Sequence, residues 1–431
     1  MKKSIGVLAA FVLSISLHAK VSNVSIVQND ASAKVSITYN LESDAIVTLS
    51  VATNGVTLGS SCLKRLVGDV NRMVRAGEGK TIHWFPAKSF PGNLIADGSL
   101  SASITLWSPD SPPDYLVCDL TVTNGVSYYV DADALPYDVT NNLYKMSSYV
   151  MRRIHATGRP WRMGSPVQGE TGDTDESRTT VNVPHNVVLT NDYYIGVFPV
   201  TQNQYWVMTG GHLDGGIASA KFKSSPDALV CPMESISYES LRGTDWPKSG
   251  RTVSGSLLKI RALTGLALDL PTEAQWEFAC RAGTGTAYNN GKNCTTAKDG
   301  TVACPNLAEV GWYGGNQNQN SYGNAKDKNT YEVGLLAPNA WGLYDMHGNV
   351  FELCLDWYSE GAAYTGTFAD GWENGVPTLE PVGAENGTLR VGRGGSYFYS
   401  PLRARSCYRS SVEPGTESSH YGFRFVCVIG E

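Results

Sequence analysis

Short runs of alternating apolar and polar residues dominate the first part of the chain. The clearest are Val35–Tyr39, Ala45–Val51 and Ser103–Trp107, and Asn54-Gly55 separates two of them with a turn-forming pair. Alternation with a period of two, rich in β-branched residues, is typical of half-buried antiparallel strands. The pattern predicts a small all-β sandwich of the immunoglobulin or fibronectin type over residues 20–108. Because that region lacks a cluster of titratable residues, we expect it to act in spacing or docking.

A proline-rich polar stretch, Ser108–Pro113, marks the best domain boundary. Residues 109–148 still contain strand-like pieces such as Val126–Val130, and we expect them to connect two domains. The second domain is predicted to cover residues 149–431.

Only two helices are predicted in that second region. Residues 271–283 have Thr272 as N-cap and Gln275 in position for a capping box, and residues 256–264 are closed by Gly265. Short strands and long loops rich in Gly and Asn make up the remainder. A large domain with so little regular structure normally needs ions or disulfides to hold its loops. The sequence therefore predicts an α+β, loop-rich domain.

The first residues have the order of a cleavable secretion signal. Lys2 and Lys3 are followed by an apolar or small stretch over residues 4–17, and Ala19 offers a small residue at the cut. The stretch is too short to span a bilayer comfortably, and a buried core helix is the alternative interpretation. We expect residues 1–19 to be a signal peptide and the mature protein to be secreted or periplasmic, without membrane insertion.

Composition agrees with an extracellular, loop-rich protein. Charged residues make up only 17% of the chain, whereas 45 Gly, 22 Tyr and 10 Trp residues are many for 431 residues. The formal net charge of −6 gives no reason to expect a nucleic-acid partner. An oxidising compartment would permit disulfides among the nine cysteines. Cys294 and Cys304 bracket a polar loop, and a disulfide between them would stabilise the fold by roughly 3 kcal/mol.

Five stretches of the second region carry the most specific signal, and they occur in a fixed order. They are Trp161–Pro166, Tyr193–Tyr205, Leu270–Phe278, Asn339–Glu352, and Arg393–Ser396 together with Tyr421–Arg424. In this order they resemble the motifs of the formylglycine-generating enzyme family, also called sulfatase-modifying factors. The resemblance covers about residues 149–428 and implies an elaborated C-type-lectin-like fold.

The resemblance also implies structural calcium. The family segment that matches residues 345–352 wraps a Ca²⁺ ion. Asp345 and Glu352 would supply carboxylate oxygens, and Gly348 and Val350 would supply backbone carbonyls. Calcium takes six to eight hard oxygen ligands, which fits this set. The alternative is that Asp345 caps a turn and Glu352 pairs with an arginine.

Two further expectations concern metals. We expect His347 to be a solvated loop residue and not a ligand. A second family calcium site would begin at Asn306 and Leu307, with Asp327 as a candidate for its other half.

At the catalytic positions the sequence departs from the family. Active members oxidise a sulfatase cysteine to formylglycine with copper held by two cysteines just after the Gly-Gly-Ser motif. Here Tyr399 falls at the first cysteine position and residues 401–403 at the second. Copper(I) selects soft thiolate ligands, so we expect no copper and predict no catalytic residue. Cys407, on the strand expected next, would pair with Cys280 or remain a buried thiol.

The segment 396–409 is instead a candidate binding surface. Its residues Tyr397, Phe398, Tyr399, Arg403, Arg405 and Tyr408 form a set rich in Tyr and Arg. Such residues bury much area for little lost entropy and offer hydrogen bonds. Alternate members of a strand pack inward, so we expect about half of the set to be exposed. Matching family substrate positions add Phe351 in place of a Trp, His420 in place of an Asn, and the retained Ser396.

Three functions follow from these observations. The leading hypothesis is an exported, calcium-stabilised family member that binds a protein or glycan through residues 396–409. The second is a formylglycine-generating oxidase with displaced catalytic residues. The third is a display protein diversified by a retroelement, because the Tyr/Ser/Arg-rich stretch before residues 422–424 resembles such a variable region.

Overall fold

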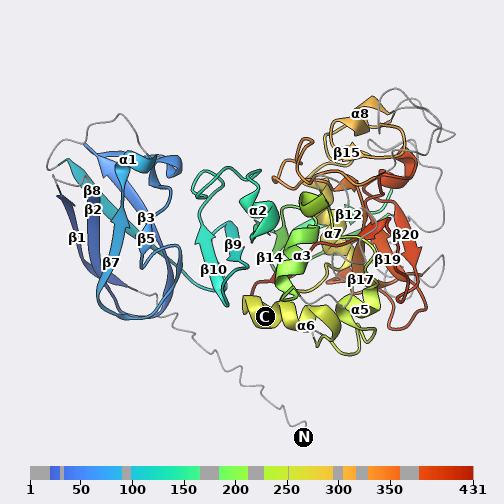
Figure 1. Ribbon diagram of the computed structural model, residues 1–431, viewed down its shortest axis with the longest axis horizontal. Helices are drawn as coiled ribbons and strands as arrows, with labels where there is room; N and C mark the ends of the chain where they lie inside the picture. Colours follow the sequence, from blue (N-terminus) through green and yellow to red (C-terminus); the bar gives the residue numbers. More distant parts are fainter. Residues whose placement is uncertain are drawn as a thin grey trace, which may run out of the picture. The chain divides into compact units, whose positions relative to one another are not determined.

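The computed structural model divides into two units, Met1–Ser108 and Pro109–Glu431 (Figure 1). It describes residues 20–29, 34–89, 99–165, 184–211, 228–250, 252–294, 304–316, 329–359 and 378–430. The expected signal peptide, residues 1–19, lies outside this set. Within the described ranges, none of the helices has the length and apolar character needed to cross a membrane.

In its described residues, the first unit consists of antiparallel sheets and short helical turns. One sheet has the order β1-β2-β7-β5, with β1 (Val21–Asn29), β2 (Lys34–Leu41), β7 (Gly77–Trp84) and β5 (Val67–Gly68). The other has β3 (Ala45–Thr53) paired with β4 (Val56–Thr57), β6 (Arg72–Val74) and β8 (Leu100–Trp107). Short helices α1 (Pro86–Ser89) and η1 (Ser60–Leu63) complete the unit.

Alternation along the sequence correctly located these strands. The three predicted runs lie in β2, β3 and β8, and in β2 every second side chain is buried. Val35 and Ile37 from β2 share one apolar cluster with Val47 and Val51 from β3. The assignment to the immunoglobulin or fibronectin type stays a prediction.

The second unit is a mixture of small sheets, short helices and long loops. Its largest sheet has the order β10-β9-β11-β14-β22, with β10 (Gly125–Tyr129), β9 (Tyr115–Asp119), β11 (Ser148–Ile154), β14 (Tyr193–Gly196) and β22 (Val426–Val428). All of its pairs are antiparallel. Residues 109–148, which we expected to connect two domains, thus supply two strands to this sheet.

A second sheet carries the segments of the candidate site. It has the order β20-β19-β17-β21, with β20 (Arg409–Val412), β19 (Arg390–Arg393), β17 (Phe351–Trp357) and β21 (Tyr421–Gly422). Smaller sheets contain β12 (Pro160–Met163), β13 (His185–Val188) and β18 (Thr378–Leu379), and the parallel pair β15 (Gly311–Trp312) and β16 (His347–Gly348).

Both predicted helices are confirmed. Helix α7 (Glu273–Arg281) has the Thr272–Gln275 capping box, and it ends before Gly283 because Ala282 already adopts a left-handed φ of 46°. Helix α6 (Gly255–Thr264) ends at Gly265 in the left-handed conformation. In Figure 1, α7 (yellow) lies in the interior of the second unit, where it packs against β17 and β19.

The expectation of only two helices was wrong. The structure also contains α2 (Leu143–Met146), α3 (Gln202–Met208), α5 (Tyr238–Arg242), α8 (Pro305–Ala308), η2 (Ala228–Val230) and η5 (Pro401–Ala404). Most are too short to show a helical period. Helix α3 had a detectable signal, because Thr201 and Gln204 form a second capping box.

A buried ion pair joins the two main sheets of this unit. Glu352 on β17 accepts hydrogen bonds from Arg424 on both carboxylate oxygens, each at 2.6 Å. Trp276 of α7 donates its Nε1–H to the same carboxylate at 2.7 Å. Arg424 also donates to Gly196 O on β14 and to Tyr344 O. Three of the five sequence stretches that carry the family resemblance therefore meet at one carboxylate, and Gly196 of a fourth contacts Arg424.

All nine cysteines are free thiols in the structure. Cys294 and Cys304 belong to one buried cluster with Tyr288 and Ala404. Burial, with the thiol of Cys294 beside it, raises the pKa of Cys304 to about 12. Cys280 and Cys407 are both buried as well. The two expected disulfides stay predictions.

Removal of the Glu352 charge should destabilise the second unit strongly. Glu352→Gln would leave the buried Arg424 guanidinium without its counter-charge, and breaking such a pair typically costs about 3–5 kcal/mol. Denaturant unfolding followed by tryptophan fluorescence would measure this loss. Glu309→Gln is the control, since the contacts of the Glu309 carboxylate with Lys292 and Asn290 are exposed to solvent. Equal midpoints for both variants would show that the pair is dispensable.

Candidate functional site

The segment 396–408 is not a strand. It passes through the 3-10 turn η5 (Pro401–Ala404), and β20 begins only at Arg409. Pro401 favours this turn because its ring fixes φ near the helical value and leaves no N–H for a sheet. Strict alternation of exposed and buried side chains is therefore absent, and Cys407 precedes the strand on which we expected it.

Exposure within the segment separates surface residues from supporting ones. Phe398 is 40% exposed, whereas Tyr397 is 1% and Arg405 7% exposed. Tyr399, Arg403 and Tyr408 are half-buried. Arg405 donates its Nε–H to Leu402 O at 3.0 Å. Arg405 and Tyr397 thus support the turn, which corrects their expected place on the binding surface.

Aromatic rings gather around His420, which lies far from the segment in sequence. Its ring centroid is 4.8 Å from that of Phe398 and 5.3 Å from that of Tyr399. Phe351 lies beneath them, fully buried, with its ring 5.6 Å from Tyr399 and 5.3 Å from Tyr421. Phe351 and the buried Ser396 therefore shape the site from below and do not face solvent.

Arg403 adds a positive charge to these rings. Its guanidinium carbon lies 4.4 Å from the ring centre of Tyr399 and 5.9 Å from that of Tyr408. An arginine on aromatic faces keeps its hydrogen-bond donors available for a ligand. We define the aromatic surface as Phe398, Tyr399, Arg403, Tyr408 and His420. The resemblance had indicated His420 by position, and Tyr421 belongs to one of the matched stretches although no role was assigned to it.

The proposed calcium loop is tightly bent. Asp345, Gly348 and Asn349 all have positive φ, at 55°, 87° and 61°. A Cβ on Gly348 would lie 1.9 Å from Trp312 O, so only glycine fits there. Asp345 is buried, and its carboxylate accepts from Gly334 N at 2.7 Å and from Asn349 Nδ2 at 3.4 Å. Burial raises the pKa of Asp345 to about 6.

Glu352 is a weaker candidate ligand than Asp345. The contacts with Arg424 and Trp276 use three of the roughly four lone-pair sites of its carboxylate. Both contacts that we considered as alternatives to calcium, a turn held by Asp345 and an arginine paired with Glu352, are thus present. Among the residues that the structure describes, no group of three or more His, Cys, Asp or Glu side chains is arranged to hold a metal. A cation here would depend on Asp345 and on carbonyl oxygens such as those of Gly348 and Val350.

His347 is not solvated, which corrects the expectation from the sequence. It is 0% exposed and donates from Nδ1 to Ala404 O at 2.6 Å. Its Nε2 accepts from Asn289 N at 3.0 Å. Burial lowers the pKa of His347 to about 4, so the imidazole is neutral near pH 7.

The second expected calcium site is only partly described. Asn306 lies on α8, donates from Nδ2 to Asn293 O at 2.7 Å, and accepts from Asn290 Nδ2 on its carbonyl oxygen at 2.8 Å. Leu307 is buried in the cluster around Tyr288. Asp327 lies outside the described residues.

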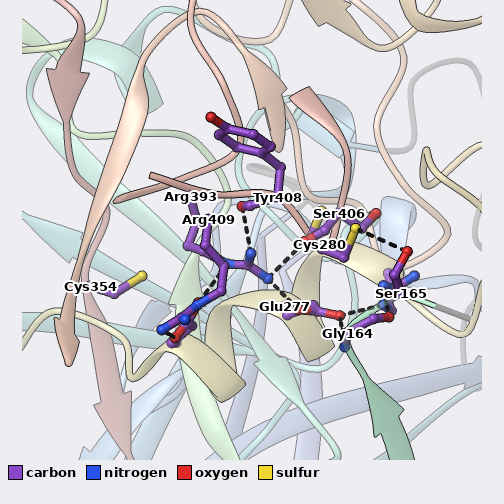
Figure 2. A network of polar contacts seen from close by, with 12 residues as sticks. Gly164, Ser165, Glu277, Cys280, Cys354, Arg393, Ser406, Tyr408 and Arg409 are labelled. Atoms are coloured by element: carbon purple, nitrogen blue, oxygen red, sulfur yellow. Dashed lines mark hydrogen bonds and ion pairs between the residues drawn. The ribbon is translucent and has the colours of Figure 1, made fainter. Parts of the chain in front are cut away.

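A buried network of charges lies under the segment 396–408 (Figure 2). Arg393 of β19 contacts Glu277 of α7 and donates to the carbonyl oxygens of Ser406 and Tyr408. Glu277 also accepts from Arg281 at 2.8 Å. Burial opposes its ionisation, but Arg281 and Arg393 outweigh this effect and hold the pKa of Glu277 below its usual value.

The same network continues at the start of α7. The carboxylate of Glu273 accepts from Arg409 Nε at 2.5 Å and Nη2 at 2.8 Å. Arg393 Nε lies 3.5 Å from the Glu273 carboxylate. Helix α7 is thereby tied to both ends of the segment that carries the aromatic surface.

Residues 160–429 match the family described as "Sulfatase-modifying factor enzyme 1-like domain". The formylglycine-generating enzyme of Thermomonospora curvata is 33% identical over 166 residues, which cover 36% of this chain and 48% of that enzyme. The serine/threonine-protein kinase pkn1 of Chlamydia pneumoniae is 32% identical over 156 residues, 36% of this chain and 20% of the kinase. The chain thus spans about half the length of the first relative and a fifth of the second.

Two solved structures show similarity over a larger part of the chain. Treponema denticola variable protein 1 has a TM-score of 0.45 and 24% identity, covering 65% of this chain and 95% of its own. PvdO from Pseudomonas aeruginosa has a TM-score of 0.46 and 19% identity, covering 65% and 94%.

The exposure pattern predicts different costs for Arg403, which lies in the segment, and for Arg393, which precedes it on β19. Arg403→Ala should lower the free energy of unfolding by less than about 1 kcal/mol, because a solvent-accessible cation–π contact contributes little. Arg393→Ala should cost about 3–5 kcal/mol, because it removes the buried guanidinium that contacts Glu277 and leaves Arg281 as the remaining arginine partner of that carboxylate. Urea unfolding of both variants checks this order. Similar losses in the two variants would mean that Arg403 belongs to the core.

Proposed function

The chain belongs to the family of sulfatase-modifying factor enzyme 1-like domains, and we propose that this member binds a protein or glycan and is not a copper-dependent oxidase. Binding would take place at the aromatic surface. The observation that carries the proposal is the cluster of the Phe398, Tyr399 and His420 rings, with the half-buried Arg403 lying over the ring of Tyr399. Rings and an arginine of this kind are enriched where proteins recognise ligands.

The residues at the family's copper positions support the same proposal. Tyr399 and residues 401–403 of the turn η5 stand where the resemblance puts the two copper cysteines. Neither supplies the thiolates that copper(I) requires. The nearby Cys407 is buried, with its Sγ 4.0 Å from Ser165 Oγ. A buried thiol is a poor nucleophile and metal ligand, because burial disfavours its ionised form.

Similarity to formylglycine-generating enzymes keeps oxidation of a sulfatase cysteine as the second candidate function. It would require a thiol other than those at the usual positions. The proposals of export through residues 1–19, of a C-type-lectin-like fold and of a diversified display role stand beside it as further expectations from the sequence. The relatives are matched over only part of their length, so their activities are proposals for this chain.

Structural calcium is part of the proposed function. Asp345 is buried, and among the described residues the Arg424 guanidinium favours its charged form whereas the Glu352 carboxylate opposes it. A divalent cation held by Asp345 and the loop carbonyls would keep Asp345 ionised despite its burial. The ion would fix the loop that precedes β17 and so the position of Phe351 beneath the surface.

Binding should depend on the aromatic surface, and oxidase activity should be missing. The mature protein can be tested on a glycan array and in a pull-down from the extracellular fraction of its host. Arg403→Ala and Tyr399→Ala should each weaken a detected interaction at least about tenfold, as expected for central residues of an interface. A Cys-x-Pro-x-Arg peptide with copper and oxygen should remain unconverted.

A control variant tests whether the loss of binding is specific to the aromatic surface. Lys259→Ala, on the outer face of α6, removes a positive charge from an exposed site and should leave binding unchanged. Conversion of the peptide by the wild type, abolished by Cys407→Ser, would establish the oxidase function and refute the binding proposal.

Calcium removal should destabilise the protein in a pH-dependent way. An ion that binds only the folded state stabilises it by mass action, so a chelator should lower the melting temperature at pH 7.5. Protons compete with calcium for Asp345, whose pKa is raised to about 6, so the chelator effect should shrink between pH 7 and pH 5. Without calcium, the pH dependence is reversed. The neutral Asp345 carboxyl then contributes to the free energy of unfolding at low pH, and this contribution is lost as the pH rises through 6.

Asp345→Asn is the control for calcium. It retains an oxygen that can accept from Gly334 N, but it lacks the charge. Its melting temperature should be the same with and without chelator. A wild-type melting curve that ignores chelator at pH 7.5 would refute the calcium proposal.

A further inference from the structure

The backbone of the turn under the aromatic surface is held by side chains from outside the segment. Tyr288 donates its hydroxyl hydrogen to Pro401 O at 3.2 Å. His347 donates from Nδ1 to Ala404 O at 2.6 Å. These two carbonyls belong to the first and last residues of η5, so both ends of the turn that carries Arg403 are anchored from below.

Tyr288 and His347 act as one buried pair. Both are 0% exposed, and their rings meet edge to face with centroids 5.5 Å apart. Because Ala404 O can only accept, and because Nε2 accepts from Asn289 N, the imidazole must carry its proton on Nδ1. Nδ1–H is therefore the donor to Ala404 O.

Arg393 holds the next part of the segment. Its guanidinium donates to Ser406 O at 2.8 Å and to Tyr408 O at 2.5 Å. Glu277 contacts the same guanidinium, and Figure 2 shows Arg393 between this carboxylate and the two carbonyls. The charge that is needed to keep Arg393 in place thus comes from helix α7, not from the segment itself.

Tyr288, His347 and Arg393 all donate to main-chain carbonyl oxygens of residues 401–408. The interactions fix the path of the backbone and leave the side chains of Tyr399, Arg403 and Tyr408 half-exposed. Gly314 adds a further anchor, because its N–H donates to Tyr399 O at 2.8 Å. A surface that is held in one conformation before a ligand arrives loses less conformational entropy on binding.

We propose that Tyr288, His347 and Arg393 are positioning residues: they preorganise the aromatic surface by anchoring the backbone of residues 401–408 from beneath. The consequence for affinity rests on the proposed binding function. The positioning itself does not, since it concerns the order of the free protein. None of the three residues needs to touch a ligand.

Hydrogen exchange tests the proposal without any ligand. Tyr288→Phe removes the hydroxyl that donates to Pro401 O and that accepts a weak hydrogen bond from Cys304 Sγ. Loss of one such hydrogen bond should speed amide exchange in peptides covering residues 396–409 about fivefold by easing local opening. The matched control is Tyr194→Phe, which removes another buried hydroxyl that donates to a carbonyl, that of Pro113. The control should leave exchange in residues 396–409 unchanged.

A second measurement reports on the surface side chain directly. Phenylglyoxal modifies accessible arginines, and its rate at Arg403 should rise in Tyr288→Phe and in Arg393→Lys but not in Tyr194→Phe. Equal effects of Tyr288→Phe and Tyr194→Phe, or faster exchange spread evenly over the second unit, would overturn the proposal. If Arg393→Lys does not fold, the Tyr288→Phe comparison still decides the matter.

The two proposals can fail separately. Faster local exchange in Tyr288→Phe together with full binding by Arg403→Ala would refute the binding surface and retain the positioning role. Unchanged exchange in Tyr288→Phe together with lost binding by Arg403→Ala would refute the positioning role and retain the binding surface.

Discussion

The buried carboxylate of Glu352 imposes the constraint on which the second unit depends. A charge that is removed from water requires hydrogen-bond partners and a counter-charge, and here Arg424 and Trp276 provide them. Arg424 also donates hydrogen bonds to the carbonyl oxygens of Gly196 on β14 and of Tyr344. One charged group thereby fixes the mutual position of two sheets and a helix in a domain that has little regular structure.

The network of Glu273, Glu277, Arg281, Arg393 and Arg409 extends the same principle toward the surface. Buried ion pairs contribute little net stability compared with apolar packing, but each partner restricts where the other can lie. Here the restricted partners are helix α7 and the segment 393–409. Burial, with the charge of Glu273 nearby, also raises the pKa of Asp356, whose carboxylate accepts from Glu273 N. Buried ion pairs thus hold these loops in place, as backbone hydrogen bonds hold the strands of a sheet.

This arrangement explains how the same family scaffold could serve binding without copper chemistry. The anchors of the turn act on main-chain carbonyls, so the fold does not depend on a thiol at position 399 or in residues 401–403. Tyr399 occupies its position through contacts with Phe351, His420 and Arg403. The residues of the aromatic surface are therefore different from Tyr288, His347 and Arg393, which anchor the backbone beneath it.

The sequence alone determined the features that arise from neighbouring residues. Alternation located β2, β3 and β8, the Thr272–Gln275 pair located α7, and ordered motifs identified the family, because each signal spans only a few positions. Exposure at the site was decided by tertiary structure. Buried, His347 donates a hydrogen bond to Ala404 O, 57 residues away, and Glu352 pairs with Arg424, 72 residues away. Residues 396–408, expected to be a strand, form a turn that is anchored by Tyr288 and His347. Burial and hydrogen-bond partners across such distances follow from packing, which no local pattern encodes.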